Sequence, residues 1–136
     1  MSNNKRIVSI VDDELDIAVL LYDALHTIKE IQVFMFTDPR MALDHLKINS
    51  KDYVLLISDL RMPVINGLQL LKTVKDLNPI VRTILTTAFQ MDNNLFQEYT
   101  KKEIINGYLQ KPIEMKQLLV EVNKQINIIE NVAKMS

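Results

Sequence analysis

The sequence predicts an α/β fold in which a five-stranded parallel sheet carries helices on both faces. Five short apolar runs, rich in β-branched residues, alternate along the chain with five segments of helical periodicity. The polar residues that stand out follow directly on the ends of these runs, where open parallel sheets bind their ligands. We therefore expect one domain over residues 1–136, with a core of about residues 5–125 and a helical C-terminal extension over residues 126–136.

The first part of the chain contains two strand-helix units. The run Arg6–Val11 suits a strand that is buried on both faces, and a helix is predicted from Glu14 to about Lys29. Ile31–Phe36 is the second strand, and Asp38-Pro39 supply the cap and first turn of the next helix. The apolar residues of these two helices are Ile17, Leu20, Leu21, Ala24, Leu25 and Ile28, followed by Met41, Ala42, Leu46 and Ile48.

The middle of the chain supplies three more strands. Tyr53–Ser58 is the most hydrophobic of the predicted strands, and the loop after it leads into a helix over Leu68–Leu77. Val81–Thr87 is the fourth strand. The polar segment Asp92–Asn106 is predicted as a helix on a few apolar anchors, and Tyr108–Gln110 is a short fifth strand.

The last helix is predicted from Glu114 to about Lys134. Its apolar residues follow a 4-3-4-3-4 spacing, which is the seam of a coiled coil. We expect the part beyond Gln125 to project past the compact domain, and to pair with a second copy or lead into an adjoining domain. The alternative is that it folds back over its own domain or frays. The residues concerned are Ile126, Ile128, Ile129 and Val132.

Composition excludes several classes of protein. The formal net charge is -1, so no basic field exists to hold nucleic acid directly. The chain contains no cysteine, which excludes disulfide frameworks and cysteine-based zinc sites. Its two histidines are too few for a histidine-rich metal site. The longest apolar runs fall short of the ~18 residues that a membrane span needs. We expect a cytoplasmic domain without membrane contact.

The polar residues at the strand ends suggest a chemistry. If the first and third strands are neighbours, Asp12, Asp13 and Asp59 meet at one edge of the sheet, where their charges repel unless a cation joins them. Oxygen ligands of this kind suit Mg²⁺. Thr87 ends the fourth strand and offers a hydroxyl to a phosphate. Lys111 follows the fifth strand and offers an ammonium. A carboxylate that accepts a phosphoryl group fits this set.

The constellation resembles the receiver domain of two-component response regulators. The matching motifs are the acidic pair of IVDDE, the run D-L-R-M-P-x-x-x-G from Asp59 to Gly67, the pair Thr87-Ala88, and Y-L-Q-K-P ending at Pro112. The spacings between Asp13, Asp59, Thr87 and Lys111 are 46, 28 and 24 residues. The resemblance covers nearly the whole chain and implies the doubly wound, flavodoxin-like strand order 2-1-3-4-5.

The resemblance also implies roles for individual residues. Asp59 would accept a phosphoryl group from the phosphohistidine of a sensor histidine kinase or phosphotransfer protein. Mg²⁺ would be held by Asp13, Asp59 and the backbone carbonyl of Arg61, with Asp12 acting directly or through water. Lys111 would bind a phosphoryl oxygen.

Two further residues would form the switch that the resemblance implies. Thr87 would move to bind another phosphoryl oxygen, and Tyr108 would swing inward in response. The output would be a downstream protein target or an adjoining output domain. The resemblance also implies a cis peptide bond between Lys111 and Pro112.

The chain departs from the family pattern at a few positions. Gln110 stands before the lysine, where a small or β-branched residue is frequent, and the segment Gln97–Asn106 is poor in alanine. Arg61 and Phe89 stand two residues after Asp59 and Thr87. The resemblance implies that these positions flank the phosphoryl group, and the bulk of the two side chains then favours slow hydrolysis.

Alternatives remain open at this point. A phosphatase that uses an aspartyl-phosphate would carry a second aspartate where Arg61 stands, and a nucleotide-binding module would need a glycine-rich loop. A degenerate receiver that serves as an unphosphorylated scaffold would lack part of the site. We expect a signalling domain and not a dedicated enzyme.

Overall fold

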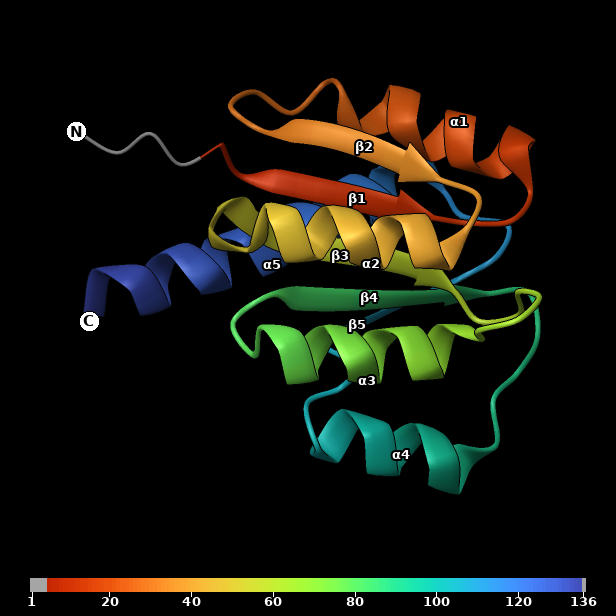
Figure 1. The fold of residues 1–136 in the computed structure, drawn as a ribbon. Helices are drawn as coiled ribbons and strands as arrows, with labels where there is room; N and C mark the ends of the chain where they lie inside the picture. Colours follow the sequence, from red (N-terminus) through yellow and green to blue (C-terminus); the bar gives the residue numbers. More distant parts are fainter. Residues whose placement is uncertain (1–4, 136) are drawn as a thin grey trace.

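The computed structural model describes the backbone of residues 5–135 and the side chains of residues 5–132. In this part of the chain, strands and helices alternate as expected (Figure 1). The elements are β1 (Ile7–Val11), α1 (Leu15–Leu25), β2 (Gln32–Phe36), α2 (Pro39–Ile48), the 3-10 turn η1 (Ser50–Asp52), β3 (Tyr53–Asp59), α3 (Gly67–Leu77), β4 (Arg82–Thr87), α4 (Asn93–Lys101), β5 (Gly107–Gln110) and α5 (Met115–Met135).

The five strands form one parallel sheet in the order β2-β1-β3-β4-β5. This order confirms the doubly wound, flavodoxin-like fold. The chain runs outward from β1 in one direction and from β3 in the other, so the carboxyl ends of β1 and β3 flank the point where the strand order reverses. Ligands of such sheets bind at this point.

A core lies on each face of the sheet. One core packs α2 and α3 against residues such as Val11 and Leu56, and the other packs α1 and α5 against residues such as Ile10 and Ile57. The side chains alternate between the two cores along each strand, because successive residues of a strand point to opposite faces. This explains why the central strands read as continuous hydrophobic runs.

Two helix starts follow directly from the local sequence. The Asp38 side chain accepts a hydrogen bond from the N–H of Arg40 at 2.9 Å, and Pro39 begins α2 as expected. Before α3, Asn66 accepts from the N–H of Gln69 at 2.9 Å, and Gln69 accepts from the N–H of Asn66 at 3.0 Å. This reciprocal pair is a capping box, and it sets where α3 begins after the loop.

Two helices are shorter than the sequence predicts. Helix α1 ends at Leu25 instead of about Lys29, because the following side chains bond back to the last carbonyls of the helix. Helix α4 covers only Asn93–Lys101, and the prediction that it reaches Asn106 is wrong. Glu103 adopts a φ of 62°, and a backbone in this left-handed region cannot continue a helix.

Three apolar residues assigned to helical stripes do not face the core. Leu20 is 52% exposed, Met41 is 61% exposed and Ile48 is 82% exposed. The buried side chains of α1 are Ala18, Leu21 and Leu25, because the strip of the helix that contacts the sheet is narrower than its apolar face. Hydrophobic periodicity located the helices correctly but overestimated the width of their buried faces.

The C-terminal part of α5 lies against its own domain, so the expectation that its isoleucines project past the compact domain is wrong. Ile126 is 6% exposed and Ile129 is 8% exposed. Glu130 forms an ion pair with Arg6, which stands just before β1. The start of β1 and the last turns of α5 lie on the same side of the sheet, where the strands begin (Figure 1). Val132 is 53% exposed, so the buried stripe stops near the end of the helix.

Candidate functional site

Three carboxylates converge at the carboxyl ends of the two central strands. Asp59 is the last residue of β3, and Asp12 and Asp13 follow β1, whose Val11 is aligned with Ser58 of β3. Oxygen atoms of the three carboxylates all lie within 4.8 Å of one another. Asp12 is 1% exposed and Asp59 is 6% exposed, whereas Asp13 is open to solvent.

Lys111 supplies the positive charge of this cluster. Its Nζ lies 2.8 Å from Oδ2 of Asp12 and 3.1 Å from Oδ1 of Asp59. The backbone of Lys111 is held by a 2.8 Å hydrogen bond from its N–H to the carbonyl of Thr87, and the Lys111–Pro112 peptide bond is cis as expected. One ammonium thus bridges two aspartates that lie far from it in the sequence.

Burial and charge both act on the ionisation of these groups. Burial raises the pKa of Asp59, the Asp12 and Asp13 charges add to this, and the hydrogen bond to Lys111 opposes it. Burial lowers the pKa of Lys111, but its hydrogen bonds and ion pairs with Asp12 and Asp59 outweigh burial, so the net shift is upward. The ammonium stays charged, and three carboxylates facing one ammonium leave an excess of negative charge that suits a cation.

The donor set of the cluster fits a hard divalent cation. All three aspartates offer carboxylate oxygens, which Mg²⁺ prefers, and among the residues that the structure describes no sulfur or imidazole ligand joins them that would favour zinc. Arg61 lies two residues beyond Asp59 on the loop after β3, so its backbone carbonyl stays a predicted ligand.

Gly67 positions the main chain behind Asp59. A Cβ atom on Gly67 would lie 2.2 Å from the carbonyl oxygen of Asp59, closer than any real contact. The N–H of Gly67 donates to the carbonyl of Leu60 at 2.7 Å, and the N–H of Leu60 donates to Thr86 at 2.9 Å. From sequence, Gly67 stood out only as the end of a motif, and no local signal indicated the close approach that makes glycine necessary.

The two predicted switch residues lie on β4 and β5. Thr87 is buried, and its hydroxyl oxygen accepts a hydrogen bond from the N–H of Phe89 at 3.0 Å. Tyr108 is half-buried, its ring packs edge-on against Phe96 with centroids 5.2 Å apart, and its hydroxyl donates to Gln110 at 2.7 Å. No hydrogen bond among the described residues joins Thr87 to Tyr108, so the structure leaves these two side chains separate.

Comparison with known proteins agrees with this geometry. The family model for the response regulator receiver domain matches residues 8–123 of the chain. The chain belongs to the receiver domain family.

Several relatives illustrate the relationship. Sporulation initiation phosphotransferase F of Bacillus subtilis is 28% identical over 131 residues, which cover 96% of this chain and all of that protein (100%). Response regulator SaeR of Staphylococcus epidermidis is 27% identical over 92% of this chain but only 51% of its own length. The receiver chain thus spans about half the length of SaeR. The transcriptional regulator NtrC of Klebsiella pneumoniae is 31% identical over 87% of this chain and 24% of its own.

Solved structures support the receiver fold. A signal receiver domain of a LuxO repressor protein from Vibrio parahaemolyticus superposes with a TM-score of 0.84 at 21% identity, covering 97% of this chain and 98% of that one. A response regulator receiver domain from Clostridium thermocellum superposes with a TM-score of 0.81 at 23% identity, covering 93% and 98%. Within residues 5–135, no helix of the receiver is long and apolar enough to cross a membrane.

Arg61 and Phe89 of the receiver stack on each other next to the two strand ends. The Arg61 guanidinium carbon lies 3.9 Å from the centre of the Phe89 ring, and both residues are exposed, Phe89 to 49%. Such a cation–π contact holds two long side chains together over the loops that follow β3 and β4. The sequence indicated both positions, but it contained no sign of their contact.

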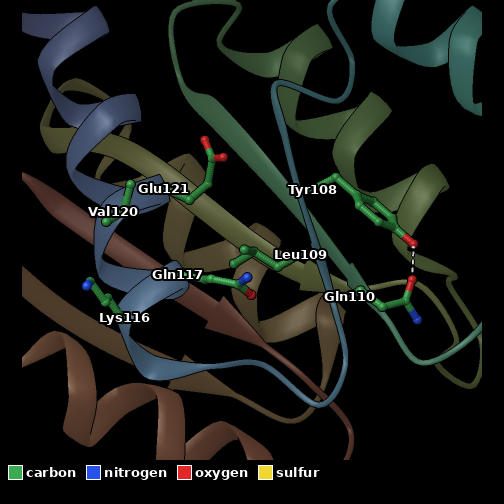
Figure 2. A pocket seen from close by; sticks show the side chains of 7 residues that line it. All are labelled: Tyr108, Leu109, Gln110, Lys116, Gln117, Val120 and Glu121. Carbon is green, nitrogen blue, oxygen red and sulfur yellow. Dashed lines mark hydrogen bonds between the residues drawn. The ribbon is translucent and has the colours of Figure 1, made fainter.

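A separate pocket of the receiver lies between β5 and α5 (Figure 2). It has a volume of about 530 Å³ and is lined by Tyr108, Leu109 and Gln110 of β5 and by one face of α5. The α5 side chains include Lys116 and Glu121, of opposite charge, and the exposed Val120. The polar residues at the strand ends do not line this pocket; these are Asp12, Asp13, Asp59, Thr87 and Lys111.

Proposed function

We propose that this receiver accepts a phosphoryl group on Asp59 and switches a protein-interaction surface in response. The donor is the phosphohistidine of a sensor histidine kinase or of a phosphotransfer protein, and the reaction depends on Mg²⁺. The observation that carries the proposal is the position of Lys111, whose ammonium contacts Asp12 and Asp59 within a cluster of three carboxylates.

The chemistry is a phosphoryl transfer between two side chains. A carboxylate oxygen of Asp59 attacks the phosphorus, an O–P bond forms, and the N–P bond of the phosphohistidine breaks with its electron pair returning to the imidazole. Lys111 is close enough to Asp59 for its ammonium to bind an oxygen of the phosphoryl group during and after the transfer. The protein mainly positions and neutralises the reactants.

Asp12, Asp13 and Asp59 would hold the Mg²⁺ ion together with the backbone carbonyl of Arg61. When bound, the ion supplies positive charge against the phosphoryl oxygens. The excess of negative charge at the three aspartates supports this assignment, because carboxylates in contact repel unless a cation separates them.

The proposal is tested by mass spectrometry of the intact chain after incubation with a small phosphodonor and Mg²⁺. We expect one added phosphoryl group on the wild type, none on Asp59→Asn, and none on the wild type when a chelator removes the metal. Asp76→Asn, which changes an exposed aspartate of α3, is the matched control and should accept the group normally. A phosphoryl group located on any residue other than Asp59 would overturn the proposal.

The output of the switch involves Thr87 and Tyr108. Thr87 would turn its hydroxyl to a phosphoryl oxygen, and Tyr108 would move with it and change the surface formed by α4, β5 and α5. The recipient is a downstream protein target or an adjoining output domain, with no direct contact to nucleic acid by the receiver. The match to this chain covers only 51% of SaeR and 24% of NtrC, which leaves room in those proteins for further parts. We propose a cytoplasmic location for these steps.

Three other possibilities that were open from sequence have less support. A degenerate scaffold would not require Lys111 and the three aspartates to converge as they do. A homodimer through α5 was suggested by the apolar seam of that helix, but Ile126 and Ile129 are already buried in their own domain. A phosphatase of the aspartyl-phosphate type would need a second carboxylate at the position of Arg61.

The stacked pair of Arg61 and Phe89 is expected to slow hydrolysis of the phosphoryl group. The two side chains stack on each other at positions two residues after Asp59 and two residues after Thr87, and a pair of this bulk would hinder the approach of water to the phosphoryl group. Replacing both by alanine should shorten the phosphorylated lifetime about threefold, which corresponds to ~0.7 kcal/mol in the barrier. The decay is followed by mass spectrometry after the phosphodonor is removed, with Leu95→Ala as a control at an exposed position of α4. A longer lifetime in the double variant would mean that the pair assists the attacking water.

A further inference from the structure

Gln110 makes a contact that none of the roles described above uses. It is the last residue of β5, its side chain is exposed, and its Oε1 accepts a 2.7 Å hydrogen bond from the hydroxyl of Tyr108 (Figure 2). Residues two apart on a strand point to the same side, so the two side chains meet without any distortion of the backbone.

The backbone of Gln110 is tied to the phosphorylation site. In the sheet it is aligned with Thr87, the residue that ends β4, and it directly precedes Lys111. The N–H of Lys111 donates to the carbonyl of Thr87 at 2.8 Å, so this end of β5 is held against β4. Gln110 therefore connects the Tyr108 hydroxyl to the two residues that are proposed to bind the phosphoryl group.

Tyr108 has a second contact in the same orientation. Its ring packs edge-on against Phe96 of α4, with an angle of 74° between the ring planes. The ring contact and the hydrogen bond together hold the side chain in the position seen here. Because the Gln110 backbone is held in the sheet, Tyr108 cannot swing toward Thr87 without breaking its hydrogen bond to Gln110.

We propose that Gln110 is a positioning residue that holds Tyr108 in its unswitched orientation and so sets the threshold of the switch. This inference rests on the proposed function, because it assigns a regulator to the same switch. Removing one partly exposed hydrogen bond should raise the switched fraction of Tyr108 about threefold in the absence of a phosphoryl group. A carboxylate at the same position accepts the hydroxyl more strongly and should lower that fraction.

The test compares Gln110→Ala and Gln110→Glu with the wild-type chain. The readout is the NMR chemical shift of the Tyr108 ring, placed on a scale between the Asp59→Asn variant and the fully phosphorylated wild type. We expect the unphosphorylated Gln110→Ala chain to move toward the phosphorylated value and Gln110→Glu to move away from it. Thermal unfolding serves as the control: a merely structural role would change the melting temperature, which we expect to stay the same for these exposed substitutions.

The two ways in which the test can fail are distinct. If phosphorylation moves Tyr108 in the wild type but both Gln110 variants show the wild-type shift, the inference about Gln110 is overturned and the proposed function stands. If phosphorylation leaves Tyr108 of the wild type unmoved, the proposed switch is overturned together with this inference.

Discussion

Gly67→Ala is expected to lower the free energy of unfolding by about 3 kcal/mol, since overpacking against rigid atoms is among the most damaging of single changes. The new Cβ would lie 2.2 Å from the carbonyl oxygen of Asp59 and 2.9 Å from Cα of Leu60. Both are backbone atoms at the end of the central strand, which cannot move without disturbing β3. Chemical denaturation of the two proteins measures the loss.

The same substitution should also impair phosphorylation, because the backbone that must shift carries Asp59. Gly107→Ala is the matched control: its Cβ would meet side-chain atoms and no backbone atom, Oε2 of Glu121 at 3.0 Å and Cγ1 of the buried Ile84 at 3.1 Å, and these need to shift by only a few tenths of an ångström. We expect this control to change the stability by less than ~1 kcal/mol. Equal stability of the two variants would show that the loop after β3 yields more easily than its contacts indicate.

Removal of residues 126–136 is expected to cost about 3–6 kcal/mol of stability, from the burial of Ile126 and Ile129 at roughly 1.5–3 kcal/mol each. This is an upper range, since unfolded chains already bury part of their apolar surface. The ion pair between Arg6 and Glu130 is lost as well. The truncation opens the core on the α1 and α5 face of the sheet to water, so thermal and chemical unfolding should both show a large decrease in stability.

Point variants separate the packing of the helix from its length. Ile126→Ala should lower the stability by about 2–4 kcal/mol, as for other buried large-to-small changes. Val132→Ala shortens an apolar side chain of the same helix that is 53% exposed, and it should have little effect. If the truncated chain is as stable as the full chain, the extension is not part of the domain, and the interpretation of α5 as a linker or pairing helix regains support.

The strands and the acidic cluster were the parts most accessible to sequence reasoning. A parallel strand that is buried on both faces must be a short continuous apolar run, and such runs ended at the residue before Asp12 and at the residue before Asp59. Because parallel strands present their carboxyl ends at one edge, these residues were expected to converge with Asp13 and Lys111 if the first and third strands are neighbours, and the resemblance to receiver domains implied that order. The structure adds the distances and the burial.

Helix ends and helix faces were less accessible. The pattern that predicted α1 included Leu20, which lies on the exposed side, because periodicity reports an apolar face and does not report how much of it the sheet covers. The seam of α5 had two explanations of equal merit, pairing with another helix or packing on its own sheet. Only the packing of the helix against β3, β4 and β5 of its own sheet decided between them.

The sequence by itself determined the order of the elements and the places where the five strands end. It also determined which polar residues stand at those ends, since both depend on local periodicity and on the rules of parallel sheets. These residues are Asp12, Asp13, Asp59, Thr87 and Lys111. Only the tertiary structure decided the contacts between residues distant in the chain. The backbone approach at Gly67, the burial of Ile126 by residues of other elements, and the stacking of Arg61 on Phe89 are of this kind. Local sequence cannot specify them, because each depends on how closely separate elements pack.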